Sequence, residues 1–183
     1  MNKLLEYSKQ IKSDAEQLLK TTNLVNILSK YGEVIIGGSY KYDLMWGPDI
    51  DIDVICKDTR SASVSALSEL INLRLFQKYE YGDFVKFPRE YRQKSYIMPL
   101  ILPFNGQKWE IEVWFFNEYP ENQKNMDELI ESEMTDAKKL IILDAKSHRQ
   151  NDKSTKHDIS SVDIYKQVLI NNATDYENIC KNI

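Results

Sequence analysis

Residues 34–54 read VIIGGSYKYDLMWGPDIDIDV, and this stretch decides the fold. Its last six residues, Asp49 to Val54, alternate strictly between acidic and apolar side chains. A period of two is typical of a half-buried strand, here with three aspartates on one face and apolar residues on the other. Alternate carboxylates on that face lie about 7 Å apart and repel one another, whereas a divalent cation between two of them would be ligated. The stretch therefore predicts a strand that binds a metal ion.

A glycine turn precedes the acidic strand. Gly37 and Gly38 follow an apolar run, and Ser39 opens a short helical turn that Gly47-Pro48 ends. Paired glycines allow a ligand to approach the backbone closely, and free N–H groups at a helix N-terminus bind anions. A phosphate site is thus predicted ten residues before a cation site. An isolated acidic strand can equally be the solvated face of an antiparallel sheet, and it is the turn that favours the functional interpretation.

Gly38-Ser39, nine further residues and Asp49-Ile50-Asp51 resemble the signature of the DNA polymerase beta-like nucleotidyltransferase superfamily. In that family a glycine-serine turn holds the nucleoside triphosphate, and an Asp-x-Asp pair holds two magnesium ions. The resemblance implies that Gly37, Gly38 and Ser39 bind the nucleotide. It also implies that Asp49 and Asp51 ligate one or two Mg²⁺ ions, and Asp53, one step further along, is expected to support Asp51.

A second acidic strand is predicted from Trp109 to Phe115, where Glu110 and Glu112 alternate with apolar residues. The family places a third carboxylate on a later strand, and Ile111-Glu112-Val113 best matches its pattern. The resemblance therefore implies that Glu112 is the third metal ligand. Glu110 is the alternative ligand, or a base for the acceptor hydroxyl. A glutamate pair on an exposed edge strand is the competing structural interpretation.

The remaining periodicity predicts an α/β (α+β) fold, with a small mixed sheet, helices packed against it and a C-terminal helical extension. Residues 1–118 are expected to form the nucleotidyltransferase core, and residues 119–183 an extension of the same compact unit. Asn105-Gly106 predicts a hairpin between strands 94–104 and 108–116. The other predicted elements are helices 1–20, 24–28, 59–78 and 120–141, a strand at 79–87, a loop at 147–158, and two capped helices after Ser160 and Thr174. In helix 59–78 the inward side chains are predicted to be Val64, Leu67, Ile71 and either Leu75 or Phe76.

Basic residues offer additional candidates. Lys86 and Arg89 belong to the densest basic cluster and are candidates for binding the nucleotide, although a solvated loop is equally compatible with the pattern. Lys146, His148 and Arg149 follow an apolar helical pattern and are interpreted as cations at a helix C-terminus. Two histidines without a partnering acid motif give no support to a nucleophilic hydrolase.

Composition limits the partners. The chain has 183 residues, a formal net charge of −4 and two cysteines. The charge disfavours a broad nucleic-acid-binding surface, and the cysteine count gives no disulfide framework. No apolar stretch is long enough to span a bilayer, so a cytoplasmic protein without a membrane segment is expected. The sequence leaves the oligomeric state open.

The functional expectation is a transferase that moves a nucleoside monophosphate from an NTP to an acceptor hydroxyl, as the resemblance implies. Stand-alone members of the family use small acceptors, and a cationic antibiotic such as an aminoglycoside or a lincosamide-like compound would suit an acidic face. Transfer to a protein or an RNA end, as in toxin or antitoxin members, is the second hypothesis. The third is a regulator that binds metal and nucleotide without catalysis.

Overall fold

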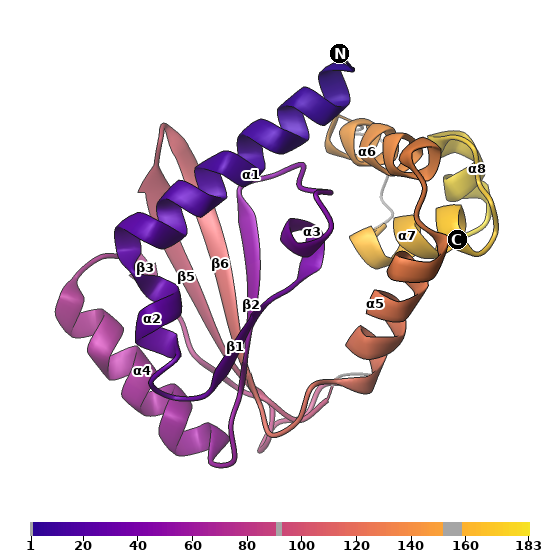
Figure 1. The fold of residues 1–183 in the computed structure, drawn as a ribbon. Helices are drawn as coiled ribbons and strands as arrows, with labels where there is room; N and C mark the ends of the chain where they lie inside the picture. Colours follow the sequence, from indigo (N-terminus) through magenta and orange to yellow (C-terminus); the bar gives the residue numbers. More distant parts are fainter. Residues whose placement is uncertain (1, 91–92, 152–158) are drawn as a thin grey trace.

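A computed structural model describes residues 2–90, 93–151 and 159–183. The helices are α1 (Lys3–Thr22), α2 (Leu24–Leu28), α3 (Gly38–Lys41), α4 (Thr59–Leu73), α5 (Glu121–Glu133), α6 (Asp136–Asn151), α7 (Ser161–Leu169) and α8 (Tyr176–Lys181). The strands are β1 (Glu33–Ile36), β2 (Asp49–Ile55), β3 (Lys78–Tyr79), β4 (Gly82–Asp83), β5 (Tyr96–Phe104) and β6 (Gln107–Phe116). Helices lie on both sides of one sheet (Figure 1), which confirms the predicted fold class.

The sheet is mixed in direction. Its order in the described part of the chain is β1-β2-β6-β5-β3, with β4 also paired to β5. Only the pairing of β2 with β6 among these is parallel. Asn105 and Gly106 have positive φ angles of 48° and 74°, and they form the predicted hairpin between β5 and β6. The single strand predicted at 79–87 is wrong: the chain forms two short strands, β3 and β4, interrupted at residues 80–81. Beyond β4 the Asp83 side chain accepts hydrogen bonds from the N–H groups of Val85 and Lys86 and turns the chain.

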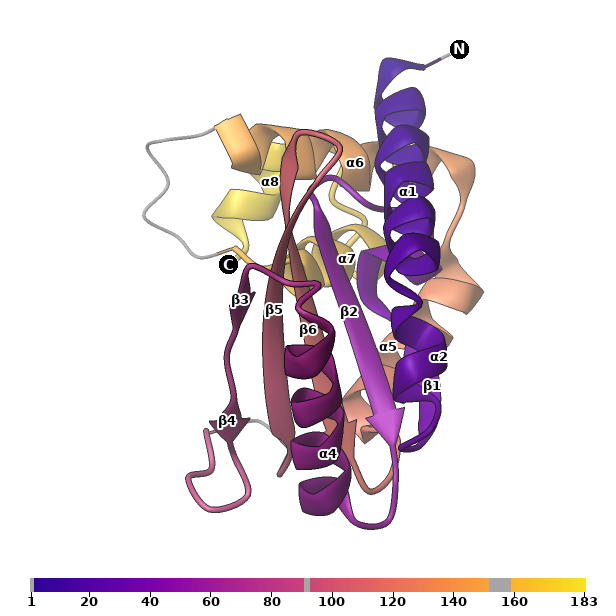
Figure 2. The ribbon, with the colours of Figure 1, turned by 90° about the vertical axis from the view of Figure 1, so that its left-hand side faces the viewer.

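The apolar face of the sheet is covered by α1, α2 and α4 (Figure 2). Ile50, Ile52 and Val54 of β2 are buried in this first core, as their alternation predicted. The prediction for α4 was right for Leu67, which packs against the first core, and wrong for Val64 and Ile71. Its buried residues are Ser63, Ala66 and Leu70, whereas Val64 and Ile71 are about half exposed. Small residues at the contact allow α4 to lie close to the sheet, so its buried face is not its most apolar one.

The other side of the sheet faces α5 to α8, which form a second core. The single helix predicted from Pro120 to Ile141 is two helices, because Met134 is extended and Thr135 then accepts the N–H of Lys138 at the start of α6. The loop predicted at 147–158 was wrong for residues 147–151, which continue α6, and its remainder lies outside the described residues.

The two ends of the chain are held by helix caps and by packing against the second core. Ser160 and Asp163 form the predicted capping box at α7, whereas α8 is capped by Asp175 and not, as predicted, by Thr174. Leu4 and Leu5 at the start of α1 pack against the second core, so the N-terminal helix contacts both cores. Within the described residues, no helix combines the length and the apolar character needed to cross a membrane.

Candidate nucleotide and metal site

The acidic faces of β2 and β6 lie side by side. Their parallel register pairs Asp51 with Glu112, and Asp49 with Glu110. Paired residues of neighbouring strands point to the same face, and the strands are about 4.8 Å apart. The structure therefore brings together Asp51 and Glu112, which were predicted to share a metal ion, and it places Glu110 beside Asp49 at the start of β2.

The glycine turn contacts this acidic pair directly. The Gly37 N–H donates to the carbonyl oxygen of Asp51 at 2.9 Å. Gly38 has φ of 58°, and a Cβ added there would lie 2.2 Å from Oδ2 of Asp51. Both the backbone conformation and the close approach therefore require glycine. Ser39 is 8% exposed, so the predicted phosphate-binding hydroxyl belongs to a buried side chain.

A cleft of about 460 Å³ separates the acidic face from the C-terminal helices, and Gly37 and Gly38 are part of its lining. Among the described residues, four carboxylates line it, from Asp51, Asp53, Glu112 and Asp127, and one ammonium, from Lys166. Aromatic and aliphatic side chains also line it, among them those of Trp114, Phe116, Met126, Ile130 and Val162. The cleft therefore combines oxygen donors with apolar surface on which a flat ring can pack.

Asp53 is the most buried of the three aspartates, with 2% of its surface exposed. Burial and the negative charge of Asp51 raise the pKa of Asp53 to about 7, while a hydrogen bond from Gln123 lowers it. Its Oδ1 atom has no hydrogen-bond partner in the described structure. A buried carboxylate oxygen of this kind is available to a ligand in the cleft.

The sequence did not identify Lys146 as part of the site. Lys146 is 2% exposed, and its Nζ donates to the Leu44 carbonyl at 2.8 Å. Burial lowers the pKa of Lys146 to about 7, while the negative charge of Asp49 opposes that shift. The inward spacing of Ile142 and Lys146, four residues apart on α6, was the available signal.

Asp49 lies at the open end of the acidic face, and its side chain is exposed. The pKa of its carboxyl is nevertheless raised, mainly because the surrounding protein desolvates it, with a smaller contribution from the negative charge of Glu110. The positive charges of Lys146 and Arg149 oppose this shift. α6 therefore brings two cations within electrostatic reach of the predicted metal ligand.

Lys86 and Arg89 lie in the segment between β4 and β5. The Lys86 ammonium is 5.4 Å from the centre of the Phe87 ring, and the Arg89 guanidinium is 4.3 Å from that of Phe84. Neither residue is part of the cleft lining among the described residues. Their binding to a nucleotide stays a prediction.

The donor set suits a hard cation such as Mg²⁺. Within residues 2–90, 93–151 and 159–183, no group of three or more His, Cys, Asp or Glu side chains is arranged to hold a metal ion. Mg²⁺ is usually held in enzymes by one or two carboxylates together with substrate phosphates. The register pair Asp51 and Glu112, with the turn beside it and the unpaired oxygen of Asp53, fits that requirement.

The fold has a counterpart of known structure. The chain is similar to a protein described in "Structure and function of the polymerase core of TRAMP, a RNA surveillance complex", with a TM-score of 0.54 and 21% sequence identity. The similarity covers 91% of this chain and 54% of that chain, so this chain spans about half the length of its counterpart. At this identity the similarity shows a shared fold. No protein-family model and no curated protein sequence matches the chain.

Proposed function

We propose that the protein transfers a nucleoside monophosphate from an NTP to an acceptor hydroxyl and releases pyrophosphate. The observation that carries this proposal is the contact between Gly38 and Asp51, with Glu112 in register beside Asp51. It puts a candidate phosphate site directly against a pair of carboxylates. The fold shared with a polymerase core supports the same class of reaction.

In the proposed reaction, the acceptor oxygen bonds to the α-phosphorus, and the bond from that phosphorus to the bridging oxygen breaks. The backbone of Gly37 and Gly38 would hold the phosphates, and Asp49, Asp51 and Glu112 would hold Mg²⁺. Mg²⁺ would neutralise charge on the triphosphate and the leaving pyrophosphate.

Two further side chains have roles in this scheme. Glu110, beside Asp49, accepts the proton of the acceptor hydroxyl. Lys146 lies within electrostatic reach of Asp49, and the negative charge of a bound triphosphate would favour its protonated form.

A small cationic acceptor, such as an aminoglycoside antibiotic, suits the cleft best. Of the four carboxylates in the lining, that of Asp127 is paired with Lys41, and the others provide negative charge that attracts amino groups. The net charge of −4 acts in the same direction. An RNA end is the second candidate acceptor, because the structural counterpart is described as the polymerase core of an RNA surveillance complex.

Calorimetry tests the site. A non-hydrolysable ATP analogue is titrated with Mg²⁺ into the protein, into Asp51→Asn and into Glu112→Gln. Both substitutions should weaken Mg²⁺-dependent binding at least tenfold. Glu69→Gln is the control, because this residue lies on α4, which packs in the first core, and is not part of the cleft lining among the described residues. Equal affinities in all four proteins would refute the proposed site.

The acceptor is identified by a transfer assay. The protein is incubated with each α-³²P-labelled NTP and, in turn, with antibiotics, RNA and proteins. Label on an aminoglycoside is the expected result. Label on RNA or on a protein would refute the small cationic acceptor and identify the acceptor instead. Tight nucleotide binding without transfer would favour a non-catalytic regulator.

A further inference from the structure

Asp127 on α5 connects three segments that are distant in the sequence. Its carboxylate accepts hydrogen bonds from Lys41 Nζ at 2.8 Å, Tyr42 Oη at 2.5 Å and Tyr119 Oη at 2.9 Å. Lys41 ends α3 and Tyr42 follows it, whereas Tyr119 lies between β6 and α5. One carboxylate thus joins the segment after the glycine turn to the opposite wall of the cleft.

These interactions are those of an ionised, well-partnered carboxylate. The Asp127 side chain is 19% exposed. Burial by itself would raise the pKa of Asp127, but the hydrogen bonds from Lys41, Tyr42 and Tyr119 outweigh it, and the pKa is lowered. Hydrogen bonds to an ionised acceptor are stronger than neutral ones, and together they restrict three segments at once.

The hydrogen-bonded cluster around Asp127 lies at the cleft that contains the candidate phosphate site. Tyr42 and Asp127 line the same cleft as Gly37 and Gly38. Lys41 belongs to the helical turn that begins at Gly38, so a shift of its side chain is transmitted to the turn through only three peptide bonds. The cluster therefore connects the candidate phosphate site to the α5 wall.

We propose that Asp127 is a positioning residue, which holds the Gly37-Gly38 turn in the conformation that binds the triphosphate. This proposal rests on the function proposed above and adds a residue that touches neither the phosphates nor the metal. If the turn adopts the binding conformation in only a tenth of the molecules, the apparent affinity for the nucleotide falls about tenfold.

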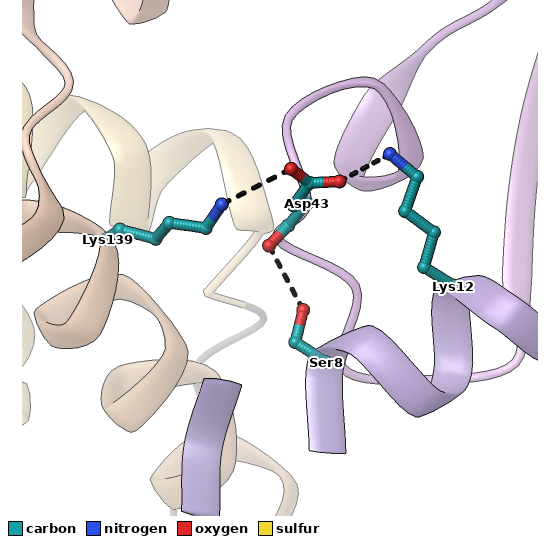
Figure 3. Close-up of polar contacts among 4 residues, drawn as sticks. All are labelled: Ser8, Lys12, Asp43 and Lys139. Carbon is teal, nitrogen blue, oxygen red and sulfur yellow. Dashed lines mark hydrogen bonds and ion pairs between the residues drawn. The ribbon is translucent and has the colours of Figure 1, made fainter. Parts of the chain in front are cut away.

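Asp43 supplies a matched control on the same segment. Its carboxylate forms ion pairs with Lys12 of α1 and Lys139 of α6, and its carbonyl oxygen accepts from Ser8 Oγ at 3.0 Å (Figure 3). Like Asp127, it bridges the segment after α3 to distant helices. Its side chain is 50% exposed and is not part of the cleft lining in the described structure.

The test compares Asp127→Asn with Asp43→Asn, using Mg²⁺ and the non-hydrolysable ATP analogue in calorimetry. Asp127→Asn should weaken binding about tenfold, and Asp43→Asn by less than about twofold. Tyr42→Phe removes one hydrogen bond to Asp127 with little risk to folding and should give an intermediate loss. Urea unfolding of each variant separates a loss of affinity from a general loss of stability. Equal affinities of Asp127→Asn and Asp43→Asn would overturn the proposal.

Hydrogen exchange of residues 37–44 gives a reading that needs no nucleotide. Asp127→Asn should raise amide exchange in this segment more than Asp43→Asn does. Unchanged exchange in Asp127→Asn would refute the positioning role even in an active enzyme. Faster exchange in a protein that binds no nucleotide would instead refute the proposed function and leave the structural role of Asp127 standing.

Discussion

Lys146 should make the protein more stable as the pH rises from 7 to 9. Its ammonium is buried, which lowers the pKa to about 7 from an ordinary value of 10.5. In the unfolded chain the side chain keeps its ordinary pKa, so between these two values the unfolded state binds more protons than the folded state. The contribution of Lys146 to the free energy of unfolding therefore rises with pH across this window. It is lowest below pH 7, where the lysine is protonated in both states.

The size of the effect follows from these two pKa values. One proton gives a slope of at most ~1.4 kcal/mol per pH unit, and integration from pH 7 to pH 9 gives roughly 2 kcal/mol. Lys146→Met keeps the length of the side chain and removes the titrating group. Groups that do not interact with Lys146, such as Asp53, titrate alike in both proteins and cancel when the two are compared.

Urea unfolding at pH 7 and pH 9, with a chelator present, measures the effect. The free energy of unfolding of the unsubstituted protein should gain roughly 2 kcal/mol relative to that of Lys146→Met over this range. Parallel behaviour of the two proteins would show that the Lys146 ammonium is not held in a desolvated position, and the reasoning about its burial would be refuted.

Two other predictions test the glycine turn and the packing of α4. Gly38→Ala places a Cβ against Asp51 at positive φ and should lower the unfolding free energy by about 2–4 kcal/mol. Gly106→Ala, also at positive φ but with no atom within 4 Å, should lower it by about 1 kcal/mol. Chemical denaturation measures both losses, and equal values would contradict the close contact of Gly38 with Asp51. Leu70→Ala, in the first core, should lower the unfolding free energy by about 2–5 kcal/mol, and Ile71→Ala, on the exposed side, by under ~1 kcal/mol; the reverse order would restore the face predicted from the sequence.

The acidic strand and its partner could be predicted because their signals are local. Alternation over Asp49 to Val54 fixes which side chains share a face, and Asn105-Gly106 fixes the register of the hairpin that contains Glu112. The face of α4 could not be predicted in the same way. Ser63 and Ala66 are buried because their size permits close contact with the sheet, and size at a contact leaves no hydrophobic pattern.

The surroundings of the site depend on contacts between distant segments. Lys146 reaches the carbonyl of Leu44 across 102 residues, and Asp127 reaches Tyr42 across 85. A charged residue in a helical pattern is normally assigned to the exposed face, so the burial of Lys146 could be inferred only once α6 was placed against the sheet. The three hydrogen bonds to Asp127 likewise require the position of α5.

The segment between α3 and β2 explains why the C-terminal helices matter to the site. Leu44 in this segment is fully buried in the second core, its carbonyl oxygen accepts from Lys146, and its N–H donates to the Ser39 carbonyl at 2.9 Å. Leu44, together with Tyr42 and Trp46, therefore anchors the connection between the phosphate turn and the acidic strand in the core that α5 to α8 build. A boundary at residue 118 stays a prediction, but the cleft is lined from both sides of it. Because the second core holds Leu44, loosening of the C-terminal helices would also loosen the segment that joins the phosphate turn to the acidic strand.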